Sequence, residues 1–165
     1  MTDIETELIK GEQLLAEFEH EKARKKFNDI IKIDPKNARA HFGKAEASLG
    51  VQKVTAEEIM ELYKKATELE PTNVFFITSL GSFCLQIGKF QDAEACYNKA
   101  TELDEENFPD YFAEFAIGYF RNAQIVYENH IDRDPNTMNM IRKKTLEYLL
   151  KAIDLAPDKA KELLG

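Results

Sequence analysis

Residues 73–104 read NVFFITSLGSFCLQIGKFQDAEACYNKATELD, and they contain two amphipathic helical patterns with a short turn between them. Apolar and small residues recur every three or four positions on both sides of the turn, which is the spacing of one helix face. Gly88 and Lys89 form the turn. The two faces consist of Ile77, Leu80, Gly81, Cys84 and Leu85, then Phe90, Ala93, Tyr97, Ala100 and Leu103. The stretch therefore predicts an antiparallel pair of helices.

The same pattern occurs earlier in the chain, two repeat steps before this one. A third, weaker copy lies between the two and is clearest at Tyr63, Ala66 and the Leu-Glu-Pro of residues 69–71. The repeat period is therefore about 34 residues, which indicates stacked helical hairpins that contact mainly their neighbours. The positions that recur are Gly11, Ala23, Phe27 and Asp34, which match Gly81, Ala93, Tyr97 and Asp104.

Cap and turn residues predict where helices of the first two hairpins begin. Thr2 with Glu5, and Thr55 with Glu58, have the spacing of capping boxes. The link at residues 50–54 is longer than the turn of the other hairpins, which explains why the second repeat step is slightly longer than the first.

Small residues recur where two helices are expected to approach each other closely. Gly11, Ala45 and Gly81 fall at one point of each first helix, and a larger side chain there would push the partner helix away. Aromatic residues on the second helices are expected to fill the space between hairpins. These are Phe27, Tyr63 and Tyr97.

The fourth unit begins like the others, since Tyr111 stands one repeat step after Ile77. Its first helical pattern then continues to about His130, and the break comes at residues 132–136. A second helical pattern follows and closes with the Leu-Ala-Pro of residues 155–157. This predicts a fourth hairpin in which both helices are lengthened relative to those of the other hairpins.

These repeats resemble those of the tetratricopeptide-repeat family, although the family's tryptophan position holds Glu7, His41, Ile77 and Tyr111. The resemblance implies an all-α, right-handed superhelical solenoid of about four antiparallel helix hairpins, with the last one lengthened. It predicts a single domain over residues 1–165, with repeats at about 4–37, 38–73, 74–107 and 108–157 and a cap or tail at 158–165. The first helices of such a solenoid line a concave groove, in which family members usually bind peptides or extended protein segments.

The resemblance also implies which residues face the groove. Co-chaperone members of the family hold a terminal carboxylate there with Lys, Asn and Arg. Here the corresponding positions hold Leu8, Glu12, Gly43, Phe75 and Ser79, so that clamp is absent. The predicted groove is instead apolar and edged by carboxylates. Its candidate residues are Leu8, Glu12, Leu15, Phe42, Glu46, Leu49, Phe75, Ser79, Phe112, Tyr119 and Phe120.

Two interpretations of this apolar surface remain open. An exposed patch of this kind usually marks a partner site, with aromatic residues as anchors. Alternatively, the long fourth hairpin or the part of the chain from Met138 onward folds back and fills the groove, and these residues are then core.

Composition excludes several classes of function. The net charge of −8 argues against a nucleic-acid partner, which would need clustered Lys and Arg. The same charge disfavours anionic membranes, and no apolar run is long enough to span one. The start of the chain lacks the features of a signal peptide, and there are only two cysteines, so we expect a cytoplasmic protein.

No motif for chemistry is present. The three histidines lack a second ligand at metal spacing, and no nucleophile elbow or glycine-rich phosphate loop occurs. We therefore expect no enzyme activity, no cofactor and no metal.

The main hypothesis is a protein–protein interaction module that binds an apolar or basic peptide or helical segment. A second hypothesis is a small tetratricopeptide chaperone of a type III secretion translocator, which Phe75-Phe76, Leu80-Gly81 and residues 88–90 resemble. A third is a self-associating structural subunit, a homo-oligomer formed through the lengthened hairpin.

Overall fold

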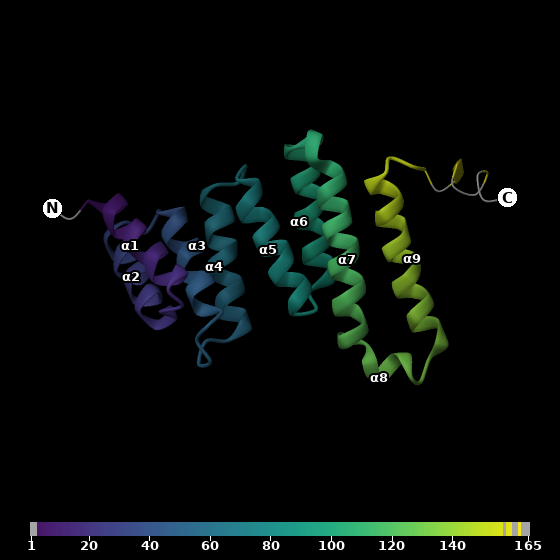
Figure 1. Ribbon diagram of the computed structural model, residues 1–165, viewed down its shortest axis with the longest axis horizontal. Coiled ribbons are helices and arrows are strands. Elements are labelled where there is room, and N and C mark those ends of the chain that lie inside the picture. Colours follow the sequence, from purple (N-terminus) through teal and green to yellow (C-terminus); the bar gives the residue numbers. More distant parts are fainter. Residues whose placement is uncertain (1–2, 157, 160–161, 163–165) are drawn as a thin grey trace. The chain divides into compact units, whose positions relative to one another are not determined.

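The computed structural model describes residues 3–156, 158–159 and 162, and this part of the chain contains helices and no strand. The predicted all-α class of antiparallel helix hairpins is confirmed (Figure 1). Thr2, Pro157 and most of the predicted tail lie outside the described residues. The chain divides into two compact units, Met1–Phe76 (unit 1) and Ile77–Gly165 (unit 2), which we describe separately. The single domain inferred from the sequence stays a prediction.

Unit 1 contains two helix hairpins. The first consists of α1 (Ile4–Ala16) and α2 (His20–Ile33), and the second of α3 (Ala38–Ser48) and α4 (Ala56–Leu69). Neighbouring helices in this order pack against each other, so the hairpins are stacked as the repeat pattern predicted.

Capping residues fix the helix starts in unit 1. The predicted capping box at Thr55 and Glu58 is present, with each side chain accepting from the other residue's backbone N–H. The predicted box at Thr2 is wrong, because the N-cap of α1 is Asp3, whose side chain accepts from the N–H of Glu5. Asn37 caps α3 by accepting from the N–H of Ala40. Each cap satisfies a backbone donor that has no partner inside its helix.

Phe27 is the centre of the core of unit 1. Its ring is fully buried and lies against two glycines, one from each first helix. A Cβ atom at Gly11 would lie 2.7 Å from the ring, and one at Gly43 would lie 2.5 Å from it. Gly11 thus has the close-approach role predicted for it. Gly43 does not face a groove as expected, because the ring of Phe27 occupies the space beside it.

Unit 2 contains the remaining helices. They are α5 (Val74–Gln86), whose first three residues belong to unit 1, α6 (Phe90–Leu103), the 3₁₀ turn η1 (Glu105–Asn107), α7 (Phe108–Val126), α8 (Glu128–Ile131) and α9 (Pro135–Ala152). The predicted lengthening of the last hairpin is confirmed, since α7 has 19 residues and α9 has 18, against 13 and 14 in α5 and α6. The first helix ends at Val126, earlier than expected, and the short α8 links it to α9.

Aromatic rings from three helices form the core of unit 2. Phe115 of α7 is fully buried, with its ring centroid 5.8 Å from that of Tyr97 in α6 and 4.4 Å from that of Tyr148 in α9. Tyr119 packs on Phe90, with centroids 5.1 Å apart. The last helix therefore pairs with α7 along its length, and the two lie side by side in Figure 1.

A charged cluster ties α9 to α6. The ammonium of Lys144 lies 2.6 Å from a carboxylate oxygen of Glu94, and the hydroxyl of Tyr148 donates to the other oxygen. Burial alone would raise the pKa of Glu94, but the hydrogen bonds from Lys144 and Tyr148 outweigh it, so that its pKa is lower than usual. The cluster therefore stabilises unit 2 when Glu94 is ionised.

Replacing Glu94 with glutamine is expected to lower the free energy of unfolding of unit 2 by about 1–2 kcal/mol at pH 7. A lowered carboxyl pKa contributes stability above the unfolded-state pKa, and that stability is lost as the pH falls through the folded-state pKa. The difference between wild type and Glu94→Gln should therefore shrink as the pH falls below about 4.5. Urea unfolding across this range measures it, with the exposed Glu128→Gln as control. A difference that did not change with pH would contradict the assignment.

Among the helices of the described residues, none is both long enough and apolar enough to cross a membrane.

Candidate functional site: a groove between α5 and α7

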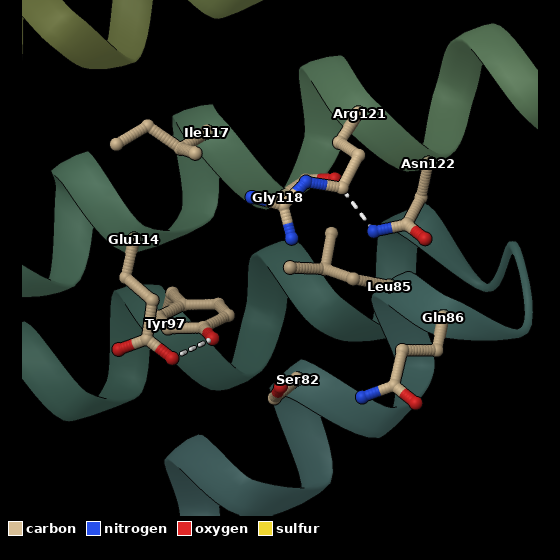
Figure 2. A pocket seen from close by; sticks show the side chains of 9 residues that line it. All are labelled: Ser82, Leu85, Gln86, Tyr97, Glu114, Ile117, Gly118, Arg121 and Asn122. Atoms are coloured by element: carbon tan, nitrogen blue, oxygen red, sulfur yellow. Dashed lines mark hydrogen bonds between the residues drawn. The ribbon is translucent and has the colours of Figure 1, made fainter.

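A pocket of about 290 Å³ opens between α5 and α7 in unit 2. We call it the α5–α7 groove, and Figure 2 shows its side chains. Both helices are the first helices of their hairpins, where the sequence predicted a partner site. The lining residues are Ser82, Leu85 and Gln86 of α5, Tyr97 of α6, and Glu114, Ile117, Gly118, Arg121 and Asn122 of α7.

Gly118 sets the depth of this groove. It lies in the middle of α7, and a Cβ atom there would lie 2.6 Å from Cδ1 of Leu85 on the opposite wall. The absence of a side chain therefore lets α5 and α7 approach and leaves room above the backbone. The side-chain amide of Asn122 donates to the carbonyl oxygen of Gly118 at 2.8 Å, which holds the Asn122 side chain along the helix.

Tyr97 forms part of the groove wall and connects it to the core. Its ring packs on Phe115, and its hydroxyl donates to Glu114 at 2.7 Å, which Figure 2 shows as a dashed line. Burial, together with this hydrogen bond to a carboxylate, raises the pKa of Tyr97 well above its usual value. Tyr97 therefore stays protonated and donates to Glu114 throughout the neutral range.

The groove also has exposed apolar and cationic groups. Ile117, which lines the groove, is 55% exposed, and Phe120, which lies one turn away on α7 outside the lining, is 36% exposed. In Figure 2 the side chain of Arg121 runs back along α7 toward Gly118, with its guanidinium directed into the pocket. Apolar surface beside an accessible guanidinium can bind a peptide segment through packing and directed hydrogen bonds.

The carboxylates predicted to edge a groove in unit 1 already have partners there. Arg39 of α3 pairs with Glu5 at 2.8 Å and with Glu12 at 2.9 Å, both on α1. Glu46 accepts a hydrogen bond from the hydroxyl of Tyr63. Arg39 offsets only part of the charge of Glu5 and Glu12, and the partner of Glu46 is a neutral hydroxyl, so the predicted attraction for a basic partner is weakened but not removed.

The apolar candidates of unit 1 separate into buried and exposed residues. Leu8 was predicted to face the groove, but it is 3% exposed and belongs to the core around Phe27, so that prediction is wrong. Leu15 packs half-buried against the same core. Phe42 is half-buried, with its ring stacked 4.7 Å from that of Phe76. The accessible candidates are Leu49, which is 49% exposed, and Phe75, which is 64% exposed.

The candidates of unit 2 on α7 need a larger correction. Tyr119 is 3% exposed and packs between Phe90 and Phe115, so it cannot contact a partner. Phe112 is half-buried under Tyr148 of α9, with ring centroids 5.7 Å apart. The fourth hairpin therefore covers these two residues, as the second of the two interpretations of the apolar surface predicted.

Ser79 and Phe120 lie beside the groove but do not line it. Ser79 is half-buried on α5, outside the set of lining residues. Phe120 is exposed on α7, next to Tyr119 in sequence but on a different face. Neither side chain belongs to the core of unit 2.

The sequence analysis missed the residues of α7 that do line the groove, which are Glu114, Ile117, Gly118, Arg121 and Asn122. The signal that could have found them is the aromatic stripe Phe108, Phe112, Phe115 and Tyr119, which recurs every three or four positions. That stripe marks the buried face of an amphipathic helix. The repeat spacing, extended from the third repeat into the fourth, instead assigned Phe112 and Tyr119 of this stripe to the groove.

The described residues contain no group of three or more His, Cys, Asp or Glu side chains arranged to hold a metal ion.

Comparison with known proteins agrees with this fold. The tetratricopeptide-repeat family matches residues 77–107. A solved structure of MamA, residues 41 to the end, from Desulfovibrio magneticus RS-1 is similar to 93% of this chain and 75% of that one, with 16% identity and a TM-score of 0.68. A second MamA structure matches over 96% and 94% of the two chains, with 19% identity and a TM-score of 0.61.

A third solved structure is that of YrrB, described as a tetratricopeptide-repeat protein with an unusual peptide-binding site. It covers 94% of this chain and 88% of its own, with 20% identity and a TM-score of 0.61. The chain therefore has the fold of these tetratricopeptide-repeat proteins, and its residues 77–107 match the repeat of that family.

Proposed function

We propose that this chain is a protein–protein interaction module that holds a peptide or helical segment of a partner protein in the α5–α7 groove. The observation that carries the proposal is a pocket between two first helices, with exposed Ile117 beside polar groups that can orient a ligand. The solved structure of YrrB, a protein of the same fold, is described as having a peptide-binding site. The proposed function is binding rather than catalysis, and the proposed compartment is the cytoplasm.

An apolar contact on Ile117 is the central element of this proposal. Ile117 is more than half exposed on a helix whose other face is buried, and such a residue in a concave site can anchor a partner side chain. The basic partner considered from the sequence is less favoured, because Arg39 offsets part of the charge of Glu5 and Glu12 in unit 1.

Two variants of α7 test the proposed groove. Random dodecapeptides displayed on phage are selected against the wild-type protein, and the strongest sequence is synthesised with a fluorescein label. We expect Ile117→Glu to weaken its binding by about tenfold or more, because a charge replaces an apolar anchor. Fluorescence anisotropy measures the dissociation constant.

Ile125→Glu is the matched control for this experiment. Ile125 lies on the same helix, is 67% exposed and does not line the groove. This variant should therefore bind the peptide as wild type does. Equal binding by all three proteins would place the peptide elsewhere, and selection of no peptide would contradict the proposed function outright.

Self-association stays a second candidate, and one observation favours it. Leu146 and Leu149 of α9 are 57% and 39% exposed, and Ile153, the C-cap residue of this helix, continues the helical spacing and is 68% exposed. The secretion-chaperone hypothesis has no comparable structural observation in its favour.

A further inference from the structure

Arg121 differs from Arg39 and Lys144, which form ion pairs with carboxylates of the protein. Arg39 pairs with two carboxylates in unit 1, and Lys144 pairs with Glu94 in unit 2. In the described part of the chain, no carboxylate lies within ion-pair distance of Arg121, although the protein has a net charge of −8. A guanidinium in the wall of a groove thus has its donors available to a ligand.

The position of Arg121 directs those donors into the groove. Side chains on a helix point toward its N-terminus and cover the preceding turn. The preceding turn here contains Gly118, which has no side chain, so the guanidinium can lie across the groove as Figure 2 shows. A planar guanidinium in this orientation matches the two oxygens of a carboxylate.

The acidic residue of the groove has a partner inside the protein. Glu114 accepts a hydrogen bond from the hydroxyl of Tyr97, a fully buried residue, so its side chain is held by the core of unit 2. Near Arg121, the amides of Gln86 and Asn122 line the same pocket and add polar groups at that end. The end of the groove that contains Arg121 therefore favours an anionic group in the ligand.

The spacing of Ile117 and Arg121 sets the spacing expected in the ligand. Four residues on a helix correspond to a rise of about 6 Å. An extended peptide rises about 3.3 Å per residue, and alternate side chains share one face, so two such side chains lie two positions apart. When an apolar side chain of the bound peptide contacts Ile117, the peptide side chain two positions further along therefore lies next to Arg121.

Resting on the proposed function, we infer that the α5–α7 groove binds an extended acidic segment. Its recognition element is an apolar residue and an Asp or Glu separated by one position, in either order along the chain. The carboxylate forms a bidentate pair with Arg121, and the apolar residue covers Ile117.

The experiment uses two labelled peptides and three proteins. The first peptide is the strongest dodecapeptide from the selection described above, and the second has each Asp and Glu changed to Asn and Gln. Arg121→Gln removes the guanidinium, and Arg133→Gln removes an exposed charge outside the groove. Arg121 is itself exposed, so thermal melting should show all three proteins folded.

We expect the selected sequences to contain the apolar-x-acidic spacing. Arg121→Gln should weaken binding of the acidic peptide by roughly 10- to 100-fold, because a hydrogen-bonded charge pair is lost. The same variant should bind the amide peptide as tightly as wild type does. Arg133→Gln should change neither affinity by more than about twofold.

The other outcomes separate the two proposals. Peptides that depend on Ile117 but lack acidic residues, or bind equally to Arg121→Gln, would overturn the acidic ligand and leave the groove as the binding site. Peptides rich in Lys or Arg would assign recognition to Glu114 instead. Peptides that depend on neither Ile117 nor Arg121, or no peptides at all, would overturn both proposals.

Discussion

Replacing Tyr97 with alanine is expected to lower the free energy of unfolding of unit 2 by about 3–5 kcal/mol. The ring is fully buried, packs against Phe115 and lies close to the backbone of Gly81, where a Cβ would be 3.0 Å away. Removing it leaves a cavity between α5, α6 and α7. Hydrogen exchange of the amides of α6 and α7 measures the loss locally.

Tyr97→Phe separates packing from hydrogen bonding in this prediction. The phenylalanine keeps the ring and removes only the hydroxyl that donates to Glu114. We expect a loss of about 1 kcal/mol, the usual net contribution of one hydrogen bond. If Tyr97→Ala cost no more than Tyr97→Phe, the ring would not be the packing element between the third and fourth hairpins.

Replacing Phe27 with alanine should have an effect of similar size in unit 1, about 3–5 kcal/mol. The ring is fully buried and lies between Gly11 and Gly43, neither of which has a side chain that could move into the cavity. Hydrogen exchange in α1, α2 and α3 should report the loss. Protection that is unchanged in these helices would contradict the central role of Phe27.

Gly43→Ala provides a matched test of the same contact. In the wild-type protein the added methyl would lie 2.5 Å from the Phe27 ring and should destabilise unit 1. With alanine at position 27 the ring is absent, and the methyl should instead stabilise α3 by up to about 1 kcal/mol through helix propensity. A change of sign between the two backgrounds is the expected result, and additive effects would show that the two residues do not interact.

Most of the fold could be predicted from the sequence because local signals and repeat spacing agreed. Gly88 does adopt a positive φ of 76° at the turn between α5 and α6, and Asn37 caps α3 where that hairpin was expected to begin. Small residues such as Gly11 and Gly81 do face buried rings. These features depend on neighbouring residues in sequence or on the repeat period.

The candidate site was harder to predict because it depends on the rotation of one helix. Counting by the repeat period placed Tyr119 in the groove, yet its ring packs between Phe90 and Phe115. The aromatic residues of α7 pack against α6 and α9, so they lie on the face of α7 that these two helices cover. Tyr119 and Ile117 are two residues apart and therefore lie on nearly opposite faces of α7, and the packing of α6 and α9 decides which face is buried.

Pairing between charges was likewise invisible in the sequence. Glu12 and Arg39 lie on different hairpins, and only the stacking of α1 on α3 brings them together. Their pairing offsets part of the carboxylate edge from which a basic partner was predicted.

Gly118 has a consequence for how this binding surface can change. Glycine in the interior of a helix is less stable than alanine by about 1 kcal/mol, so Gly118→Ala would favour the helical conformation of α7, but it would also force the buried side chain of Leu85 to move. The added methyl would also meet Leu85 and occupy the floor beneath Arg121. Helix propensity and groove volume thus oppose each other at one residue, because the substitution that favours the α7 helix also fills part of the proposed peptide-binding surface.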